Sequence, residues 1–350
     1  MNALVFLTAV LTSKGSFQTN PAVGNLLVPA LVGGVACFTI TMFAGPYFIR
    51  MIRSLNLGKQ IREELPQHLS KSGTPSMGGF LFTVPVVALT VVYNLFDHLS
   101  MLLPVTVVVL CSILGWVDDR LTTIRVHGEG LRARFKFAWL LVIAVAIVVI
   151  LHIPQVTAPA DQNKVYIPGI AFISIGLIYW PLAVLAIVGT ANAVNLTDGL
   201  DGLAAGTGAM AFGAFGAISL LAHPSKPWLA AFCCTMVGAL LAFLWFNVFP
   251  ARVIMGDTGA LAIGAALATV ALMLNQMLIL AVVGFVYVIE TLSVIFQVAY
   301  FKMTHGRRIF RSAPLHNHLE LMGWHENEVT QRFWIVSILA AVAGLTLAFT

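Results

Sequence analysis

Long apolar runs alternate with short polar segments along the whole chain. Each run holds roughly 20 residues, enough for a helix to cross about 30 Å of hydrocarbon. Backbone groups in lipid must be hydrogen-bonded internally, and the runs are too long and continuous for barrel strands, so we expect helices. The pattern predicts an all-α polytopic membrane protein with about ten transmembrane helices. The expected spans are 25–49, 78–96, 101–117, 135–152, 169–192, 202–222, 228–246, 258–274, 277–300 and 331–349.

The composition supports a membrane protein and excludes a soluble globular one. Hydrophobic residues make up 59% of the 350 positions and charged residues only 9%. No polar segment between the spans is long enough for a separate soluble domain, so we predict one integral-membrane domain over residues 1–350. The third and eighth expected spans are short, and the fifth contains Pro181.

The basic residues predict the orientation in the membrane. Sixteen of the 19 lysine and arginine residues fall in loops on one side. The positive-inside rule makes that side cytoplasmic and places both termini outside the cytoplasm. Eleven of the 14 acidic residues lie on the same side, which predicts one polar, metal-binding site at the cytoplasmic surface. The loops on this side are 50–77, 118–136, 193–201, 247–257 and 301–332.

Two adjacent acids, Asp118 and Asp119, end the third expected span in the string GWVDDR. They could be solvated acids at a helix end beside Arg120. However, carboxylates at a helix C-terminus oppose the helix dipole, so basic neighbours or a bound cation must offset them.

The string NAVNLTDGLDGLAAG at 192–206 carries two asparagines and two aspartates. Asp198 or Asp201 could cap the sixth span. Two acids and two amides within ten residues exceed what a cap needs, and Gly199 indicates a tight turn whose amides can meet a ligand. Asp257 could likewise cap the eighth span, but such a helix N-terminus also suits a phosphate.

The loop at 301–332 combines basic residues with His316 and His318. The spacing could hold zinc, but the nearby acids favour a hard cation, and basic residues beside histidines suit a phosphate-rich ligand. The alternative is an ordinary basic loop that touches lipid headgroups.

Glu290 lies within a span, where it could bind a ligand or belong to a buried hydrogen-bond network.

Together these residues suit phosphoryl transfer from a soluble diphosphate to a lipid phosphate. Mg²⁺ commonly takes one or two protein carboxylates and leaves its other positions to phosphates and water. Catalysis would then depend on positioning and charge neutralisation.

The same residues carry a resemblance to a known family that runs nearly end to end. The chain resembles the bacterial phospho-N-acetylmuramoyl-pentapeptide transferases, the MraY enzymes of peptidoglycan biosynthesis. The acidic motifs are shared with the wider polyprenyl-phosphate N-acetylhexosamine-1-phosphate transferases, and the segment from Pro314 to Trp334 is similar to the MraY branch. The matching strings are HLSKSGTPSMGG, GWVDDR, NAVNLTDGLDGLA, NVFPARVIMGDTGAL and APLHNHLELMGWHENEVTQRFW.

The resemblance implies transfer of phospho-MurNAc-pentapeptide from its UDP carrier to undecaprenyl phosphate, giving lipid I and UMP. It further implies a Mg²⁺-dependent homodimer in the bacterial inner (plasma) membrane, surrounded by membrane lipid; we expect no nucleic-acid partner. By motif position, Asp257 would be the main metal ligand, with Asn195 a possible second. Asp118 would be the base that deprotonates the lipid phosphate, with Asp119 and Asp201 in support. Residues expected around the nucleotide are Lys71, Asn195, Leu196, Asp198, Gly199 and Asn247, with His316 and His318 on the diphosphate or sugar side.

Two positions depart from the family pattern. Asn317 replaces the middle of three consecutive histidines, and it cannot titrate or carry a positive charge. Ile254 replaces a phenylalanine that can stack on uracil, so uridine affinity is expected to be lower.

Several alternatives stay open. The reaction could be a direct displacement or proceed through a covalent phospho-sugar on an aspartate. A sister enzyme could transfer GlcNAc-1-phosphate or another aminosugar phosphate. A secondary transporter is disfavoured because transporters bind near the bilayer midplane, whereas these ionisable residues gather at one surface.

Overall fold

A computed structural model describes residues 21–55, 73–95, 98–124, 130–222 and 224–350. The long helices are α2 (Pro21–Ser54), α3 (Gly79–Thr90), α4 (Leu102–Ile124), α5 (Ala133–Leu151), α6 (Tyr179–Thr197), α7 (Leu203–Leu221), α8 (Pro227–Asn247), α9 (Gly256–Met273), α11 (Phe285–Met303) and α13 (Glu326–Leu347). The shorter elements are the helices α10 (Met277–Val283) and α12 (Leu315–Leu321), and the strands β1 (Lys164–Ile167) and β2 (Ala171–Ser174).

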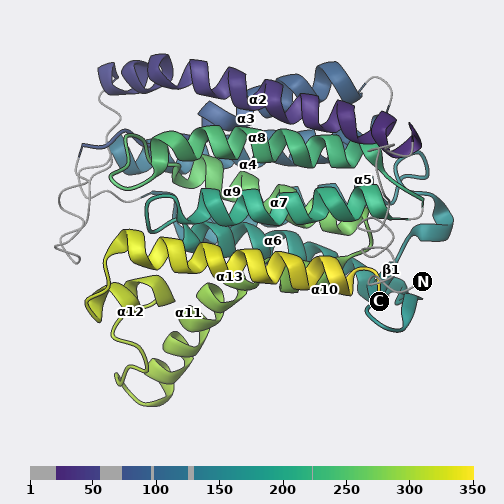
Figure 1. Ribbon diagram of the computed structural model, residues 1–350. Helices are drawn as coiled ribbons and strands as arrows, with labels where there is room; N and C mark the ends of the chain where they lie inside the picture. The colour runs from purple at the N-terminus through teal and green to yellow at the C-terminus, as the bar shows by residue number, and fades with distance from the viewer. Residues whose placement is uncertain (1–20, 56–72, 96–97, 125–129, 223) are drawn as a thin grey trace, which may run out of the picture.

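The expectation of an all-α membrane bundle is confirmed. In the described part of the chain, nine helical segments are long and apolar enough to cross a membrane, and Gly79–Tyr93 is a shorter apolar helix. These ten segments correspond to the ten expected spans. The first described residues of α2 and the end of α13 lie at the same end of the bundle as β1, opposite α12 (Figure 1).

Helix α9 forms the centre of the bundle and is buried over almost its whole length. It packs against α3, α4, α6, α7 and α10. Many residues of α9 are Ala or Gly, and these small side chains allow the neighbouring helices to approach it closely. A Cβ built on Gly115 of α4 would lie only 2.2 Å from the carbonyl oxygen of Asp257, so glycine is required where α4 crosses the start of α9.

The fifth expected span, 169–192, is wrong at its start. Residues 164–174 form an antiparallel hairpin in which Lys164 pairs with Ser174, and α6 begins only at Tyr179. The turn contains Pro168 and Gly169, whose φ is +75°, and the flanking residues alternate in the β-branched and aromatic pattern of strands. Apolar content alone did not distinguish this hairpin from a helix.

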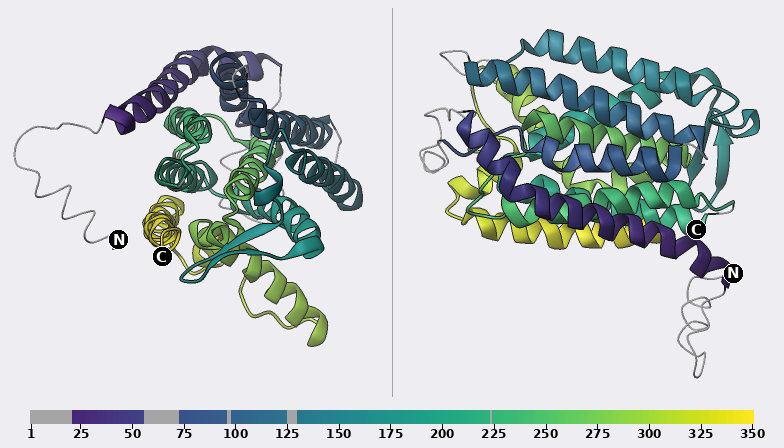
Figure 2. Two further views of the ribbon diagram at one scale, coloured as in Figure 1. Left: turned by 90° about the vertical axis from the view of Figure 1, so that its right-hand side faces the viewer. Right: turned by 90° about the horizontal axis from the view of Figure 1, so that it is seen from above.

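The ninth expected span, 277–300, is two helices. Helix α10 ends at Val283 and α11 starts at Phe285, with Gly284 between them. Helix α11 leans out of the bundle (Figures 1 and 2). Few of its residues are buried, although Glu290 and Gln297 are among them.

Candidate functional site

Asp257 stands in the first turn of α9, directly after Gly256, whose φ is +71°. Asp119 of α4 caps this helix start. Its Oδ1 accepts a hydrogen bond from the Asp257 N–H at 3.0 Å, and its Oδ2 accepts from the N–H and hydroxyl of Thr258 at 3.0 and 2.6 Å. A carboxylate here satisfies free N–H groups and complements the positive end of the helix dipole. Asp119 therefore holds α9 against α4 and fixes where Asp257 projects.

Lys136 joins the acidic residues into one cluster. Its Nζ contacts Asp118 Oδ2 at 3.1 Å and Asn195 Oδ1 at 3.2 Å, and it forms an ion pair with Asp257 Oδ2. Asn195 also donates from Nδ2 to Asp257 Oδ1 at 2.7 Å. Residues from α4, α5, α6 and α9 thus meet around one positive charge.

Asp118 and Asp119 do not end a helix, as the sequence suggested. Helix α4 continues to Ile124, and Thr122 and Thr123 donate hydroxyl hydrogen bonds to the carbonyls of Asp118 and Asp119. The two side chains point to different partners: Asp119 to the start of α9, and Asp118 to Lys136 and the N–H of Leu131. Their division of roles follows from the angle of about 100° between successive helical residues.

Sequence reasoning missed Lys136, which it counted only among the basic residues of a cytoplasmic loop. A signal was present, because Lys136 falls just inside the expected span 135–152, where an unpaired ammonium is expensive. In the structure its side chain is only 16% exposed and has two carboxylate partners.

The donor atoms of this cluster fit a magnesium ion. No group of three or more His, Cys, Asp or Glu side chains in the described residues is arranged to hold a metal. However, two carboxylates and an amide oxygen converge on the Lys136 ammonium, which shows that Asp118, Asp257 and Asn195 can surround one cation with oxygen atoms. Mg²⁺ needs no more protein ligands than this.

Asp201 belongs to a second cluster. It accepts the Ala251 N–H on Oδ2 at 2.9 Å, while its own N–H donates to Glu326 Oε1 at 2.6 Å. The amide of buried Asn247 links the same segments: Oδ1 accepts from Gly202 N–H at 3.0 Å, and Nδ2 donates to Val253 O at 2.9 Å. Asp201 and Asn247 therefore hold the turn after α6 to the segment before α9, rather than joining Lys136.

The two histidines have different surroundings. His316 is 1% exposed and contacts Glu290 of α11, and its Nε2 faces Gly199. His318 accepts a hydrogen bond from the Arg311 N–H at 3.1 Å and packs edge-on against Phe310. These contacts lie within its own loop and stabilise that loop.

The other predicted nucleotide residues are located as follows. Leu196 and Asp198 are half-buried at the end of α6, and Gly199 is exposed in the turn that follows. Lys71 lies outside the described residues. Ile254, one of the two departures, is held by its backbone, since its N–H donates to Pro75 O and its carbonyl accepts from Gly78. Its side chain is half-buried, as is that of Asn317, the other departure.

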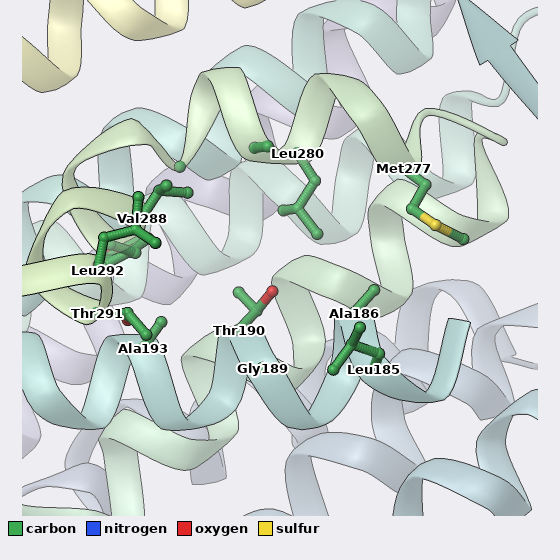
Figure 3. Close-up of a pocket in the computed structure, with 13 residues that line it drawn as sticks. Leu185, Ala186, Gly189, Thr190, Ala193, Met277, Leu280, Val288, Thr291 and Leu292 are labelled. Carbon is green, nitrogen blue, oxygen red and sulfur yellow. The ribbon is translucent and has the colours of Figure 1, made fainter. Parts of the chain in front are cut away.

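An apolar groove of about 400 Å³ runs between α6 and the α10–α11 pair (Figure 3). Thr190 and Ala193 of α6 line it, facing Leu280, Val288 and Leu292. Its α6 wall ends two residues before Asn195 of the acidic cluster. The groove therefore lies along α6, the helix that also carries Asn195.

The described residues form ten apolar helical segments, and four of these helices, α4, α5, α6 and α9, carry the acidic cluster at one end of the bundle. This arrangement defines a polytopic membrane protein with a candidate active site. The model of glycosyl transferase family 4 matches residues 99–275, about half of the chain.

Two relatives with similar sequences identify the family within this wider class. A phospho-N-acetylmuramoyl-pentapeptide-transferase of Chloroflexus aurantiacus is 47% identical over 327 residues, which cover 91% of this chain and 89% of the relative. One of Chloroflexus aggregans is 46% identical with the same coverage. The chain belongs to glycosyl transferase family 4 and, within it, to the family of phospho-N-acetylmuramoyl-pentapeptide transferases.

Proposed function

We propose that this protein transfers phospho-MurNAc-pentapeptide from UDP-MurNAc-pentapeptide to undecaprenyl phosphate, giving lipid I and UMP. The observation that carries the proposal is the convergence of Asp118, Asp257 and Asn195 on one cation at the end of the bundle. A transfer between two phosphates needs a place where negative charges are brought together and neutralised. The names of the relatives support this substrate pair over other aminosugar phosphates.

Asp257 and Asn195 would hold Mg²⁺, with Asp118 beside them. When bound, this ion would neutralise the diphosphate of the donor and lower the repulsion that opposes attack by another anion. Lys136 would then move its ammonium from these oxygens toward the phosphates. Its long, flexible stem permits such a change without movement of α5.

In the proposed reaction an oxygen of the lipid phosphate attacks the β-phosphorus of the donor. A new P–O bond forms to the lipid, and the bond between the β-phosphorus and the bridging oxygen breaks, so UMP leaves with that oxygen. Asp118 accepts the proton of a monoprotonated lipid phosphate. Asp119 is not placed to act as this base, because both of its oxygens accept hydrogen bonds at the start of α9, and its role is to hold Asp257 in place.

The apolar groove between α6 and α11 fits the polyprenyl chain of the acceptor. Its lining is almost entirely hydrocarbon, and it follows α6, the helix that carries Asn195 nearer its end. A chain lying there would bring its phosphate from the membrane to the acidic cluster.

We further propose that the cluster faces the cytoplasm of a bacterial cell, in the inner membrane, and that the protein acts as a homodimer.

UMP release by the purified protein, with both substrates and Mg²⁺, tests the proposal. Release should require both substrates and metal and should be lost in Asp257→Ala. Turnover with UDP-GlcNAc, but not with UDP-MurNAc-pentapeptide, would replace the proposed reaction with that of the sister enzymes. No release with either donor from folded protein would refute a transferase. A phospho-sugar trapped on the protein without lipid would replace the direct displacement with a covalent route.

A further inference from the structure

Glu290 is the one acid that falls within the expected spans, and the acidic cluster does not use it. It lies in α11, is completely buried, and faces the start of α12. A buried carboxylate is costly unless several donors surround it. The hydrogen-bond partners of Glu290 therefore show which contact offsets the free energy of burying its carboxylate.

Two N–H groups of His316 surround the Glu290 carboxylate. The backbone N–H donates to Oε1 at 3.2 Å and to Oε2 at 3.5 Å, and Nδ1 lies 3.1 Å from Oε2. The tautomer with its proton on Nδ1 lets the ring donate to an ionised carboxylate, which can only accept. Glu290 thereby fixes both the start of α12 and the rotation of the imidazole ring.

The opposite side of the same ring reaches the turn after α6. A Cβ built on Gly199 would lie 2.2 Å from Nε2 and 2.7 Å from Cε1 of His316. The imidazole therefore packs directly against the backbone of Gly199. Glu290, His316 and Gly199 form a continuous line of contacts from α11 to that turn.

We propose that Glu290 is a positioning residue that acts through His316 on the turn at 198–202. The inference rests on the proposed function, since this turn follows Asn195 and Leu196 and contains Asp198, the residues expected around the nucleotide. His316 itself is almost fully buried and supports the turn from behind. The line of contacts holds the turn in the conformation that receives the donor nucleotide.

Glu290→Gln tests the first contact without changing side-chain volume. Its amide has one acceptor oxygen instead of two and carries no negative charge, so it holds the two His316 N–H groups more weakly. We expect kcat/KM for the UDP-sugar to fall about tenfold or more, the usual effect of losing an orienting partner. The loss should appear mainly in KM for the UDP-sugar. Ser293→Ala is the matched control, because Ser293 is buried on the same helix and donates only to the backbone carbonyl of Glu290.

A double-mutant cycle decides whether Glu290 acts through His316. In a His316→Ala background, Glu290→Gln should cost little further activity, because the ring it orients is absent. Equal losses in both backgrounds would overturn the inference. The same cycle on thermal unfolding should also be non-additive. Thermal unfolding needs no turnover. A wild-type protein that releases no UMP would therefore refute the proposed function, and the unfolding cycle would still show whether Glu290 and His316 interact.

Gly199→Ala tests the second contact. Its methyl group would collide with the ring, so we expect loss of activity in the wild type and substantial recovery when His316→Ala is added. Gly213→Ala, where no atom lies within 4 Å of the added methyl group, is the control in both backgrounds. An equal loss from Gly199→Ala with and without the ring would contradict the proposed line of contacts.

Discussion

The ammonium of Lys136 is paired with the carboxylate of Asp257, although 121 residues separate them in the chain. The pair joins the start of α5 to the start of α9. The same ammonium contacts Asp118 and Asn195, so one lysine organises the polar groups of four helices.

Lys136→Met should destabilise the protein in metal-free buffer. Removing one partner of a buried ion pair costs about 3–5 kcal/mol, and partial exposure of this cluster reduces that to about 1–3 kcal/mol. Mg²⁺ should restore part of the loss, because an ion that binds only the folded state stabilises it. Thermal unfolding in detergent, with and without MgCl₂, measures both effects. Arg134→Met is the control, since Arg134 is an exposed cation two residues earlier. Equal unfolding temperatures for Lys136→Met and the control would refute this role.

Asp119→Ala should destabilise the protein by about 1–2 kcal/mol through loss of the cap on α9. Asp119→Asn should cost less because its amide oxygen still accepts a hydrogen bond. Thr258→Val removes one of the same hydrogen bonds, so its effect should shrink in the Asp119→Ala background. Denaturation of the four variants provides the comparison. Full additivity would show that Asp119 and Thr258 act independently.

Gly115→Ala should be among the most damaging single methyl additions in the protein. The new Cβ would meet the backbone of Asp257 and Thr258, which cannot rotate away, and such overpacking costs about 1–3 kcal/mol or more. Asp257 would move, so UMP release should fall as well. Gly213→Ala has open space around it and should be neutral or stabilising by up to about 1 kcal/mol. A tolerated Gly115→Ala would contradict the close crossing of α4 and α9.

Gly189→Leu should obstruct the groove between α6 and α11. Gly189 lines the groove, and no atom lies within 4 Å of an added Cβ, so the side chain can enter it without disturbing the backbone. We expect KM for undecaprenyl phosphate to rise about tenfold, equivalent to about 1.4 kcal/mol of binding, with KM for the UDP-sugar unchanged. Gly213→Leu provides the control outside the groove. A rise in KM for the UDP-sugar instead would place the acceptor chain elsewhere.

The apolar runs predicted the helices well because a membrane span is mainly a matter of length and hydrophobicity. The same measure failed at 169–174, where half of an equally apolar hairpin was assigned to a helix, and at Gly284, where the helix stops within a continuous run. Both departures depend on local backbone geometry that average hydrophobicity does not record.

The acidic residues were found because acids are scarce in this chain, but their division of labour depends on tertiary contacts. Asp118 and Asp119 are adjacent, yet one contacts Lys136 and the other caps α9. Asp201 and Asp257 both follow the expected motifs, yet they lie in separate hydrogen-bond networks. Lys136 was missed because its long side chain reaches partners that no local spacing reveals. Glu290 was recognised as unusual, but its contact with His316 required the structure.

The enclosure of α9 has a consequence for how the protein is made. Helices α3, α4, α6 and α7 all contact α9, and all are synthesised before it. Ribosomes therefore deliver the surrounding helices first and the central one late. The early helices cannot reach their final packing until residues beyond 256 enter the bilayer. A nascent chain halted after α8 would lack the interior of the bundle, and membrane quality-control proteases should degrade it.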